Sequence, residues 1–396
     1  MHFSCTNYLI AGNSFLVSCI YEGMKLILLL LVAITFSHCT PADKKSTLTY
    51  NAGFKTIHIV DKSRIYKPNT DTADYLHYRP IDIDIWYPAD SSATDTMLLV
   101  HDLLGLFEQR ANYYTASNVG NGLAPQIAQL FCTGFKCSDS TTLLRFKTNS
   151  YKDASTSTGK FPLVIYMTAY NGMSYENYSL FEALAKKGFV VVTISSIGRF
   201  PGDMTMKEAD LMEQVNDAVT ALSVLKQDQN IDFNKIGIVG YSWGGLAGTV
   251  LAAKIPAINC LVSLEGSEFH HYGDAKDENA DFDTIRNSAD FKNLHLSIPY
   301  LRLESSPATQ TDKIDSVYNF SSNHADSSQI FTIDSAQHED FGCFSRVVRE
   351  SGNCTVNQRY NSALKLTVSF LEDHLKNENS FSKTVEEEIN KTIKKK

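Results

Sequence analysis

Five residues, Gly240-Tyr241-Ser242-Trp243-Gly244, combine a nucleophilic side chain with the spacing that exposes it. They follow the apolar run 236–239 and lead into a stretch of small and apolar residues, 245–253, that can form a helix. A serine at such a strand-to-helix corner lies on a sharp bend, where larger side chains two positions away would collide. Glycine removes the collision and tolerates the strained backbone. The motif therefore predicts a serine hydroxyl exposed for nucleophilic attack.

The residues around this motif alternate between short apolar runs and helical patterns. Such alternation is typical of a parallel sheet that helices cover on both faces. The fold class is therefore predicted as α/β with a mostly parallel central sheet. We expect strands at 163–167, 189–194, 236–239, 258–264, 300–303 and 330–333, and helices at 180–187, 207–226 and 361–375.

Segments outside this alternating region have different patterns. Residues 54–60 and 80–87 are predicted as two strands, and the isoleucine–aspartate alternation of the second favours a half-exposed antiparallel pair at a sheet edge. Residues 91–150 are rich in turn residues, especially at 118–129 and 132–142, and we interpret them as an insertion bordering the site. Residues 383–396 are mostly charged and are expected to fray into solvent.

A catalytic serine needs a base, usually histidine, and the histidine needs a carboxylate that fixes its tautomer and stabilises its cation. A strand–turn–helix serine motif is typical of α/β-hydrolases, in which the acid and then the histidine follow the serine along the chain. His338 lies just after the last expected strand, whereas His270 and His271 follow an earlier strand closely and His374 lies on the closing helix. We therefore predict an α/β-hydrolase fold with Ser242 as nucleophile and His338 as base.

The acid has more than one candidate. Glu265 follows the expected strand 258–264, and Glu304 follows the expected strand 300–303. Asp312, in the loop beyond, is a weaker option. Strand order alone leaves Glu265 and Glu304 as equal candidates.

An oxyanion hole requires two backbone N–H groups aimed at the developing negative charge. We expect one from Trp243, directly after the nucleophile. The other should come from the loop after strand 163–167, where Ala169 and Tyr170 are the candidates and Tyr170 is preferred.

Composition excludes some classes of function. The chain has 396 residues, 43% of them hydrophobic, and a net charge of −8, which is typical of a globular protein. No basic stripe is present, so we expect no nucleic-acid partner. No cysteine spacing matches a zinc site, and we expect neither a metal nor a cofactor.

The remaining cysteines suggest local pairing. Cys132 and Cys137 are close enough in sequence to form a disulfide, as are Cys343 and Cys354. Cys260 lies in an apolar run and is expected as a buried thiol.

The amino terminus has the pattern of an export signal. Met24-Lys25 precede the apolar run 26–34, which has the length of a signal core and is short for a membrane span. Cys39 closes this segment, before a polar stretch, as in bacterial lipoprotein signals in which that cysteine carries the lipid. We expect a periplasmic, membrane-anchored or secreted protein. Its parts are then a signal segment 1–38, with 1–23 interpreted as an over-long start, a linker 39–51, the hydrolase domain 52–375 and a charged tail 376–396.

Several segments together resemble one known branch of the α/β-hydrolases. They are residues 79–88, 159–166 and 184–192, the serine motif, the turn His338-Glu339-Asp340-Phe341 and the segment 367–375. Over residues 52–375 the chain resembles the platelet-activating-factor acetylhydrolase and dienelactone-hydrolase-like branch. The resemblance implies an acid directly after strand 258–264, which favours Glu265, although relatives have aspartate there. Relatives also have Ser-His-Gly where this chain has Met167-Thr168-Ala169.

The resemblance implies calcium-independent hydrolysis of carboxylic esters with short acyl groups, without a cofactor. We therefore expect an exported serine esterase acting on a small-molecule or lipid-like ester. An amidase or peptidase would use the same residues, and an acetylhydrolase acting on polysaccharide fits an exported protein. The non-enzymatic alternative is a surface lipoprotein that uses the fold as a binding module, which the altered segment 167–169 favours.

Overall fold

A computed structural model describes residues 49–90, 96–115, 122–135, 137, 139–268, 276–305, 325–349, 354–389 and 391–395. The compact unit that contains them is Leu48–Lys396. The expected signal segment 1–38, Cys39 and Asp312 lie outside the described residues. Within the described ranges, no helix is both long enough and apolar enough to cross a membrane.

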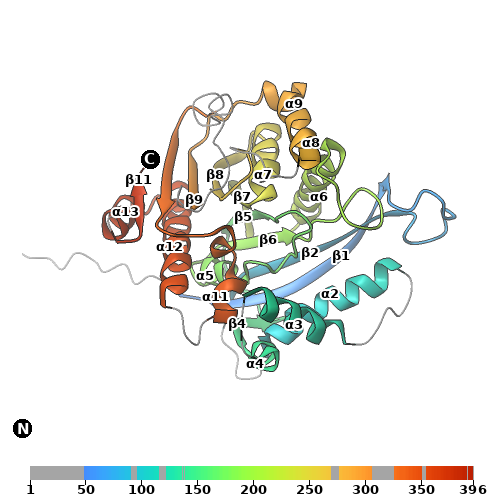
Figure 1. Cartoon of the computed structure of the whole chain (residues 1–396), viewed down its shortest axis with the longest axis horizontal. Helices are drawn as coiled ribbons and strands as arrows, with labels where there is room; N and C mark the ends of the chain where they lie inside the picture. The colour runs from blue at the N-terminus through green and yellow to red at the C-terminus, as the bar shows by residue number, and fades with distance from the viewer. Residues whose placement is uncertain are drawn as a thin grey trace, which may run out of the picture. The chain divides into compact units, whose positions relative to one another are not determined.

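The α/β prediction is confirmed, because a large sheet with a parallel centre organises the unit (Figure 1). The described strands are β1 (Asn51–Ile65), β2 (Tyr78–Ala89), β3 (Met97–Leu99), β4 (Lys147–Lys152), β5 (Phe161–Met167), β6 (Val190–Ile194), β7 (Ile231–Tyr241), β8 (Ile258–Leu264), β9 (Tyr300–Ser305), β10 (Ser328–Ile333) and β11 (Ile393–Lys395). Their order in the sheet is β11-β10-β9-β8-β7-β5-β6-β2-β1-β4-β3. The strands from β6 through β5, β7, β8 and β9 to β10 run parallel.

Helices cover both faces of the sheet. One face carries α2 (Val100–Thr115), α3 (Leu123–Phe135), α4 (Ser140–Arg145), α5 (Tyr178–Lys186), α11 (Cys343–Arg349), α12 (Cys354–Lys376) and α13 (Phe381–Glu388). The other carries α6 (Glu208–Leu225), α7 (Trp243–Lys254), α8 (Lys276–Asn287) and α9 (Ala289–Lys292).

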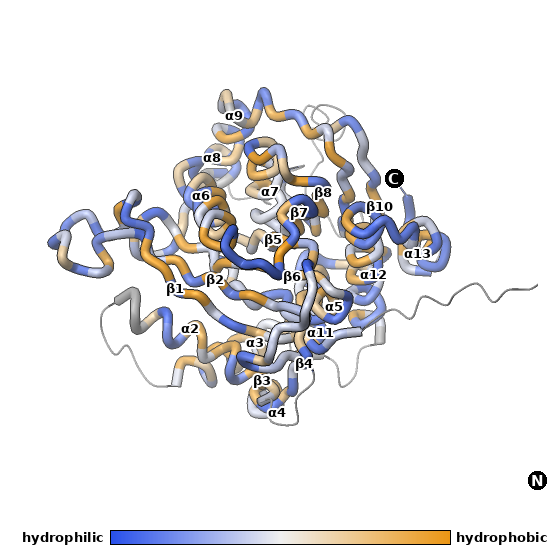
Figure 2. The backbone as a smooth tube through the Cα atoms, turned by 180° about the vertical axis from the view of Figure 1, so that it is seen from behind, coloured by the Kyte–Doolittle hydropathy of each residue, from blue (hydrophilic) through white to orange (hydrophobic). Residues whose placement is uncertain are grey.

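The two faces divide the core because side chains alternate along each strand. In β5, Val164 and Tyr166 pack in the core on the α5 and α12 side. Leu163 and Ile165 pack in the core on the α6 and α7 side. Helix α7 is buried over nearly its whole length, and Figure 2 shows its largely hydrophobic colouring at the centre of the unit.

The antiparallel pair β1 and β2 forms as predicted, but its expected place at the sheet edge is wrong. Strands β4 and β3 continue the sheet beyond β1. The expected half-exposure of β2 is also wrong, because the strand is buried along almost all of its length. Its aspartates point inward: the buried Asp84 accepts two hydrogen bonds, of 2.8 and 2.7 Å, from Arg110 of α2. A buried arginine thus permits a polar alternation that otherwise indicates solvent.

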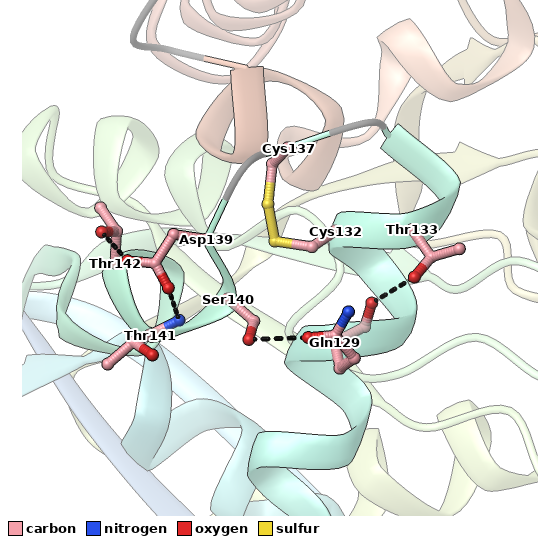
Figure 3. The surroundings of a disulfide bond; sticks show 8 residues. All are labelled: Gln129, Cys132, Thr133, Cys137, Asp139, Ser140, Thr141 and Thr142. Carbon is pink, nitrogen blue, oxygen red and sulfur yellow. Dashed lines mark hydrogen bonds between the residues drawn. A yellow bond between two sulfur atoms is a disulfide. The ribbon is translucent and has the colours of Figure 1, made fainter.

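Residues 91–150, which are rich in turn residues, contain the helices α2, α3 and α4 over much of their length. The predicted disulfide between Cys132 and Cys137 is confirmed at the end of α3 (Figure 3). Beside it, Asp139 caps α4 by accepting a hydrogen bond from Thr141 N at 2.8 Å (Figure 3). Asp139 therefore begins a second helix within a stretch whose composition resembles a loop.

The other cysteines differ from one another. Cys260 is a buried free thiol, as predicted. The expected pairing of Cys343 with Cys354 is wrong, because Cys343 is also a buried free thiol, and its Sγ donates to the Glu176 carbonyl at 3.3 Å. The side chain of Cys354 lies outside the described residues.

The expected fraying of the charged carboxyl-terminal segment is also wrong. Residues 381–388 form α13, and β11 pairs antiparallel with β10. Phe381 and Ile393 are buried, and Lys365 of α12 forms an ion pair of 2.7 Å with Glu388. Two apolar anchors and this ion pair therefore hold a segment whose average composition suggests a solvated tail.

Candidate active site

Ser242 lies on the sharp bend between β7 and α7. Its backbone angles are φ 54° and ψ −122°, a conformation that L-residues rarely adopt. A Cβ atom at Gly240 would lie 2.2 Å from the Gly244 carbonyl oxygen, and one at Gly244 would lie 2.0 Å from the Met167 carbonyl oxygen. Gly240 is therefore required by the close approach to Gly244 that the motif predicts, whereas Gly244 is required by the approach of the end of β5.

The structure brings Ser242 and His338 together. His338 begins the 3₁₀ helix η2 (His338–Phe341), which follows β10 at the same edge of the sheet. Its Nε2 lies 2.9 Å from Ser242 Oγ. Ser242 is buried, whereas His338 is exposed. A nucleophile and a base at this distance can exchange a proton directly.

Tyr241 is a residue of this site that the sequence analysis missed. Its hydroxyl donates a hydrogen bond of 3.0 Å to the His338 carbonyl oxygen. Its ring stacks on the His338 imidazole, with 5.2 Å between ring centroids and 26° between the planes. The position before the serine tolerates many residue types, so the motif itself carries no signal for this role.

Glu265 directly follows β8, beside the end of β7 that carries the serine. Ser242 N donates to the Leu264 carbonyl oxygen at 3.0 Å. Glu265 is buried and has a positive φ of 47°. Its carboxylate accepts hydrogen bonds from Ser305 N and, at 2.7 Å, from Ser305 Oγ. Ser305 therefore holds this carboxylate at the end of β9.

Glu304 lies within β9, which extends one residue beyond it. Its carboxylate forms an ion pair of 2.9 Å with the buried Arg302. Glu268, which the sequence analysis missed, lies 3.3 Å from the same guanidinium and accepts a bond of 2.6 Å from Tyr300. Burial alone would lower the pKa of Arg302, but Glu268 and Glu304 raise it. The Glu304 charge thus serves to neutralise a buried cation.

The loop after β5 contains Ala169 and Tyr170, the two candidates for the second oxyanion donor. Gly172 N donates to the Ala169 carbonyl at 2.8 Å, and Asn171 has a positive φ of 50°, which closes a tight turn with Tyr170 in second position. The Tyr170 ring packs edge-on to Trp243, with centroids 6.3 Å apart. Ala169 N donates to Glu176 at 2.9 Å and is therefore engaged away from the nucleophile. Of the two candidates, this geometry favours Tyr170.

Glu176 is a second carboxyl group that the sequence analysis missed. Its Oε1 accepts from Ala169 N and also, at 3.1 Å, from the Tyr166 hydroxyl. Burial raises the pKa of Glu176 to about 8, against the opposing effect of these two hydrogen bonds. No sequence signal distinguishes it, because a single glutamate in a polar loop is ordinarily solvated.

No group of three or more His, Cys, Asp or Glu side chains is arranged to hold a metal ion in the described ranges. The site as described consists of a hydroxyl, an imidazole, several carboxyl groups and backbone N–H groups.

Known proteins are similar to this chain at the level of fold. A family model described as "alpha/beta hydrolase fold" matches residues 162–285, from β5 into α8. No curated protein matches the sequence. A solved structure of a ferulic acid esterase from Streptomyces cinnamoneus superposes with a TM-score of 0.56 at 16% sequence identity, covering 86% of this chain and 93% of the esterase chain. Together with the parallel sheet and the strand–turn–helix serine, these matches show that the chain has the α/β-hydrolase fold.

Proposed function

We propose that this protein is a serine hydrolase that cleaves carboxylic esters. The observation that carries the proposal is the distance of 2.9 Å between Ser242 Oγ and His338 Nε2. The serine lies on a strained bend at the carboxyl end of the central strand β7. This is the geometry that nucleophilic acyl transfer requires. The similar solved structure is an esterase, which supports an ester substrate by analogy of fold.

In the proposed reaction, Ser242 Oγ attacks the ester carbonyl carbon while His338 Nε2 takes its proton. The negative charge on the carbonyl oxygen is stabilised by the backbone N–H groups of Trp243 and Tyr170. His338 then gives the proton to the departing alcohol, and an acyl-enzyme is left on Ser242. A water molecule, deprotonated by His338, attacks the acyl-enzyme and releases the acid.

We propose Glu265 as the acid that steadies the protonated His338. It follows the strand next to the one that carries Ser242, and Ser305 holds its buried carboxylate in place. Glu304, the alternative, is paired with Arg302. The resemblance to the acetylhydrolase and dienelactone-hydrolase-like branch also supports Glu265.

The same resemblance supports esters with short acyl groups, including acetyl esters, as the substrate class. We further propose that residues 1–38 direct export and that Cys39 is the site of lipid attachment, because an apolar run of signal length ends at this cysteine. Mass spectrometry of the protein from a membrane fraction would detect the lipidated cysteine at the new amino terminus.

The test of the function compares wild type with Ser242→Ala on a short-chain nitrophenyl ester. Loss of the nucleophile should lower turnover by ~10⁴-fold or more, because serine and histidine act as a unit. A fluorophosphonate probe should label the wild type and not the variant. Ser369→Ala is a matched control, since Ser369 is a buried serine whose hydroxyl donates to the Leu366 carbonyl at 3.3 Å within α12. Equal rates for wild type and Ser242→Ala would exclude the proposal.

A binding module without catalysis is the second candidate, and one observation favours it. The segment Met167-Thr168-Ala169 stands where the branch that the chain resembles has Ser-His-Gly, and Ala169 N is bonded to Glu176. If the wild type neither hydrolyses esters nor reacts with the fluorophosphonate probe, this second candidate replaces the first. An amidase or peptidase would react with the probe and would be separated from an esterase by its rates on matched amides and esters.

A further inference from the structure

Glu176 lies where two parts of the proposed site meet. Its side chain acts on the loop after β5, because Oε1 accepts from Ala169 N at 2.9 Å and from the Tyr166 hydroxyl at 3.1 Å. Tyr166 belongs to β5, and Ala169 precedes the proposed oxyanion donor Tyr170. One carboxyl group thus fixes the orientation of the peptide next to the oxyanion donor relative to the sheet.

The backbone of the same residue acts on the segment that carries the histidine. The Glu176 carbonyl oxygen accepts from Cys343 N and from Cys343 Sγ, each at 3.3 Å. The neighbouring Asn177 donates from Nδ2 to the Phe341 carbonyl at 3.0 Å. Phe341 ends η2, the short helix that His338 begins. Residues 176 and 177 therefore connect the oxyanion loop with the histidine turn.

The packing leaves the loop little room to rearrange. A Cβ atom at Gly172 would lie 2.6 Å from Glu176 Oε2 and 2.7 Å from Ala169 N. A glycine is therefore required where the turn approaches the carboxyl group. A displacement of the Glu176 side chain would remove the acceptor that orients the Ala169 peptide.

We propose that Glu176 is a positioning residue, which fixes the oxyanion loop and joins it to the histidine turn. This inference rests on the ester hydrolysis proposed above and deepens it. Glu176 does not contact the reacting atoms in the proposed mechanism. It acts through the Ala169 peptide, which sets the direction of the next N–H group.

The titratable groups described around Glu176 are neutral at pH 7 and do not compensate a negative charge on its carboxyl group. Glu176 is faced by Tyr166 of β5, Tyr241 of β7 and Cys343 of α11, and burial raises the pKa of all three, to about 12 for Cys343. With the Glu176 pKa at about 8, the carboxyl group is mostly neutral at pH 7 and becomes an anion above pH 8. A negative charge there opposes the negative charge of the oxyanion.

The charged groups near the histidine turn have no described hydrogen bond or ion pair with the Glu176 carboxyl group. Asp340 of η2 is paired with Arg359 at 3.0 Å, and Glu339 and Glu265 act electrostatically on Tyr241. Protonation of His338 removes the base and governs the acid side of the rate profile. Ionisation of Glu176 should therefore affect the rate on the alkaline side of the pH–rate profile.

The experiment measures kcat and KM of the whole chain from pH 5 to 9.5 with a short-chain nitrophenyl ester. The wild type should lose about tenfold in kcat as pH rises through 8. Glu176→Gln keeps an oxygen acceptor without the ionisation, so its kcat at pH 7 should stay within about threefold of wild type and the alkaline decline should disappear. Glu176→Ala should lower kcat by about 10- to 100-fold with KM nearly unchanged, since it displaces one oxyanion donor.

Glu182→Gln is the matched control. Glu182 is a buried glutamate of α5 whose pKa burial also raises, and it accepts from Ser150 Oγ at 2.7 Å and Asn149 N at 2.6 Å, away from the site. Its replacement should leave the rate profile of the wild type intact.

Two results would overturn the inference: an alkaline decline in Glu176→Gln equal to that of wild type, or an unchanged kcat in Glu176→Ala. If Glu176→Ala does not fold, the dependence of kcat on pH in Glu176→Gln is sufficient to test the inference. If Ser242→Ala is inactive while the Glu176 variants match wild type, this inference fails and the proposed function stands. If Ser242→Ala is as active as wild type, both fail.

Discussion

Buried carboxyl groups have different partners in two regions of this molecule: backbone amides in one and arginines in the other. At the carboxyl ends of the parallel strands, near Ser242, Glu176 accepts a hydrogen bond from Ala169 N. Glu265 accepts one from Ser305 N. Neither has a described ion pair with an arginine or a lysine. Each carboxyl group therefore holds a loop by its main chain.

In the region where β1 and β2 meet α6, buried carboxylates pair with arginines instead. Asp217 of α6 lies 2.6 Å from Arg79 of β2 and 2.7 Å from Arg64 of β1. Arg79 is fully buried and also donates to the carbonyl groups of Ile197 and Gly198. Burial alone would lower the pKa of Arg79, and Asp217 raises it. These ion pairs fasten a helix to the sheet.

The two kinds of carboxyl group therefore have different roles: one sets the position of a main-chain segment, and the other stabilises the fold. A carboxyl group that holds a backbone amide without a cation sets where a loop lies, and its protonation depends on the pH of the surroundings. A carboxylate paired with a buried arginine stays charged, and its loss leaves a buried cation without compensation. Substitutions in the first region should therefore change turnover, and substitutions in the second should change the free energy of unfolding.

The largest effect is expected for Glu265→Gln, which should lower kcat by about 10³- to 10⁴-fold. Replacing the acid of such a triad by its amide leaves the histidine without a partner for its cation and in the wrong tautomer. Steady-state rates on a short-chain nitrophenyl ester measure the loss. Glu304→Gln is the control, and it should alter stability through Arg302 more than turnover. A large loss of kcat in Glu304→Gln alone would transfer the acid role to Glu304.

In the ion-paired region, Asp217→Asn should lower the free energy of unfolding by about 3–5 kcal/mol, because Arg79 and Arg64 then lose a buried counter-ion. The kcat of the folded fraction should stay within about twofold of wild type. Urea unfolding followed by circular dichroism gives the first quantity, and titration with the fluorophosphonate probe gives the folded fraction.

Asp334→Asn provides the surface comparison. Asp334 pairs with Lys394 at 2.8 Å, but both side chains are largely exposed. Its replacement should cost less than about 1 kcal/mol. A loss as large as that of Asp217→Asn would show that burial is not what separates the two pairs.

Local patterns were sufficient to predict the central sheet and the bend at Ser242. Strand 258–264 was predicted to the residue, because a buried parallel strand is a mostly apolar run between polar segments. The histidine followed from chain order, and it lies within hydrogen-bond distance of the serine. These features depend on residues close together in sequence or on the order of strands.

The missed features depend on contacts between distant residues. The burial of β2 requires Arg110 of α2, and the ordering of α13 requires contacts with α12 and β10. The role of Glu176 requires a turn that returns the chain by seven residues to Ala169 and a second segment more than 160 residues away. Composition averaged over a segment cannot reveal a single partner that changes its environment.

Glu176 also predicts how stability responds to pH. Its pKa is raised from 4.5 to about 8 by burial, so the folded state binds a proton that the unfolded state releases between these values. The stability that this proton provides is fully present below pH 4.5 and is lost as pH rises through 8. Glu176→Gln should therefore lose less stability than wild type between pH 5 and 9, by on the order of 4 kcal/mol. Urea unfolding at both pH values measures the difference, and parallel losses would contradict the assignment.

The smallest effect on turnover is expected at Tyr241, where one hydrogen bond supports the histidine turn. Tyr241→Phe removes the bond of 3.0 Å to the His338 carbonyl and keeps the ring that stacks on the imidazole. One such bond contributes about 0.5–1.5 kcal/mol, so kcat should fall by about 2- to 10-fold. Stopped-flow or steady-state rates at saturating ester measure this change.

Tyr87→Phe separates positioning from general stability. The Tyr87 hydroxyl donates a bond of 2.7 Å to the Ala154 carbonyl in a buried setting away from the serine, so both variants lose the same kind of bond. Both should lose similar stability, but only Tyr241→Phe should lose turnover. If neither variant changes kcat, the histidine turn is held sufficiently by Asn177 and by the Glu176 carbonyl. The contribution of Tyr241 would then lie in its ring, because stacking would be the contact that orients the imidazole toward Ser242.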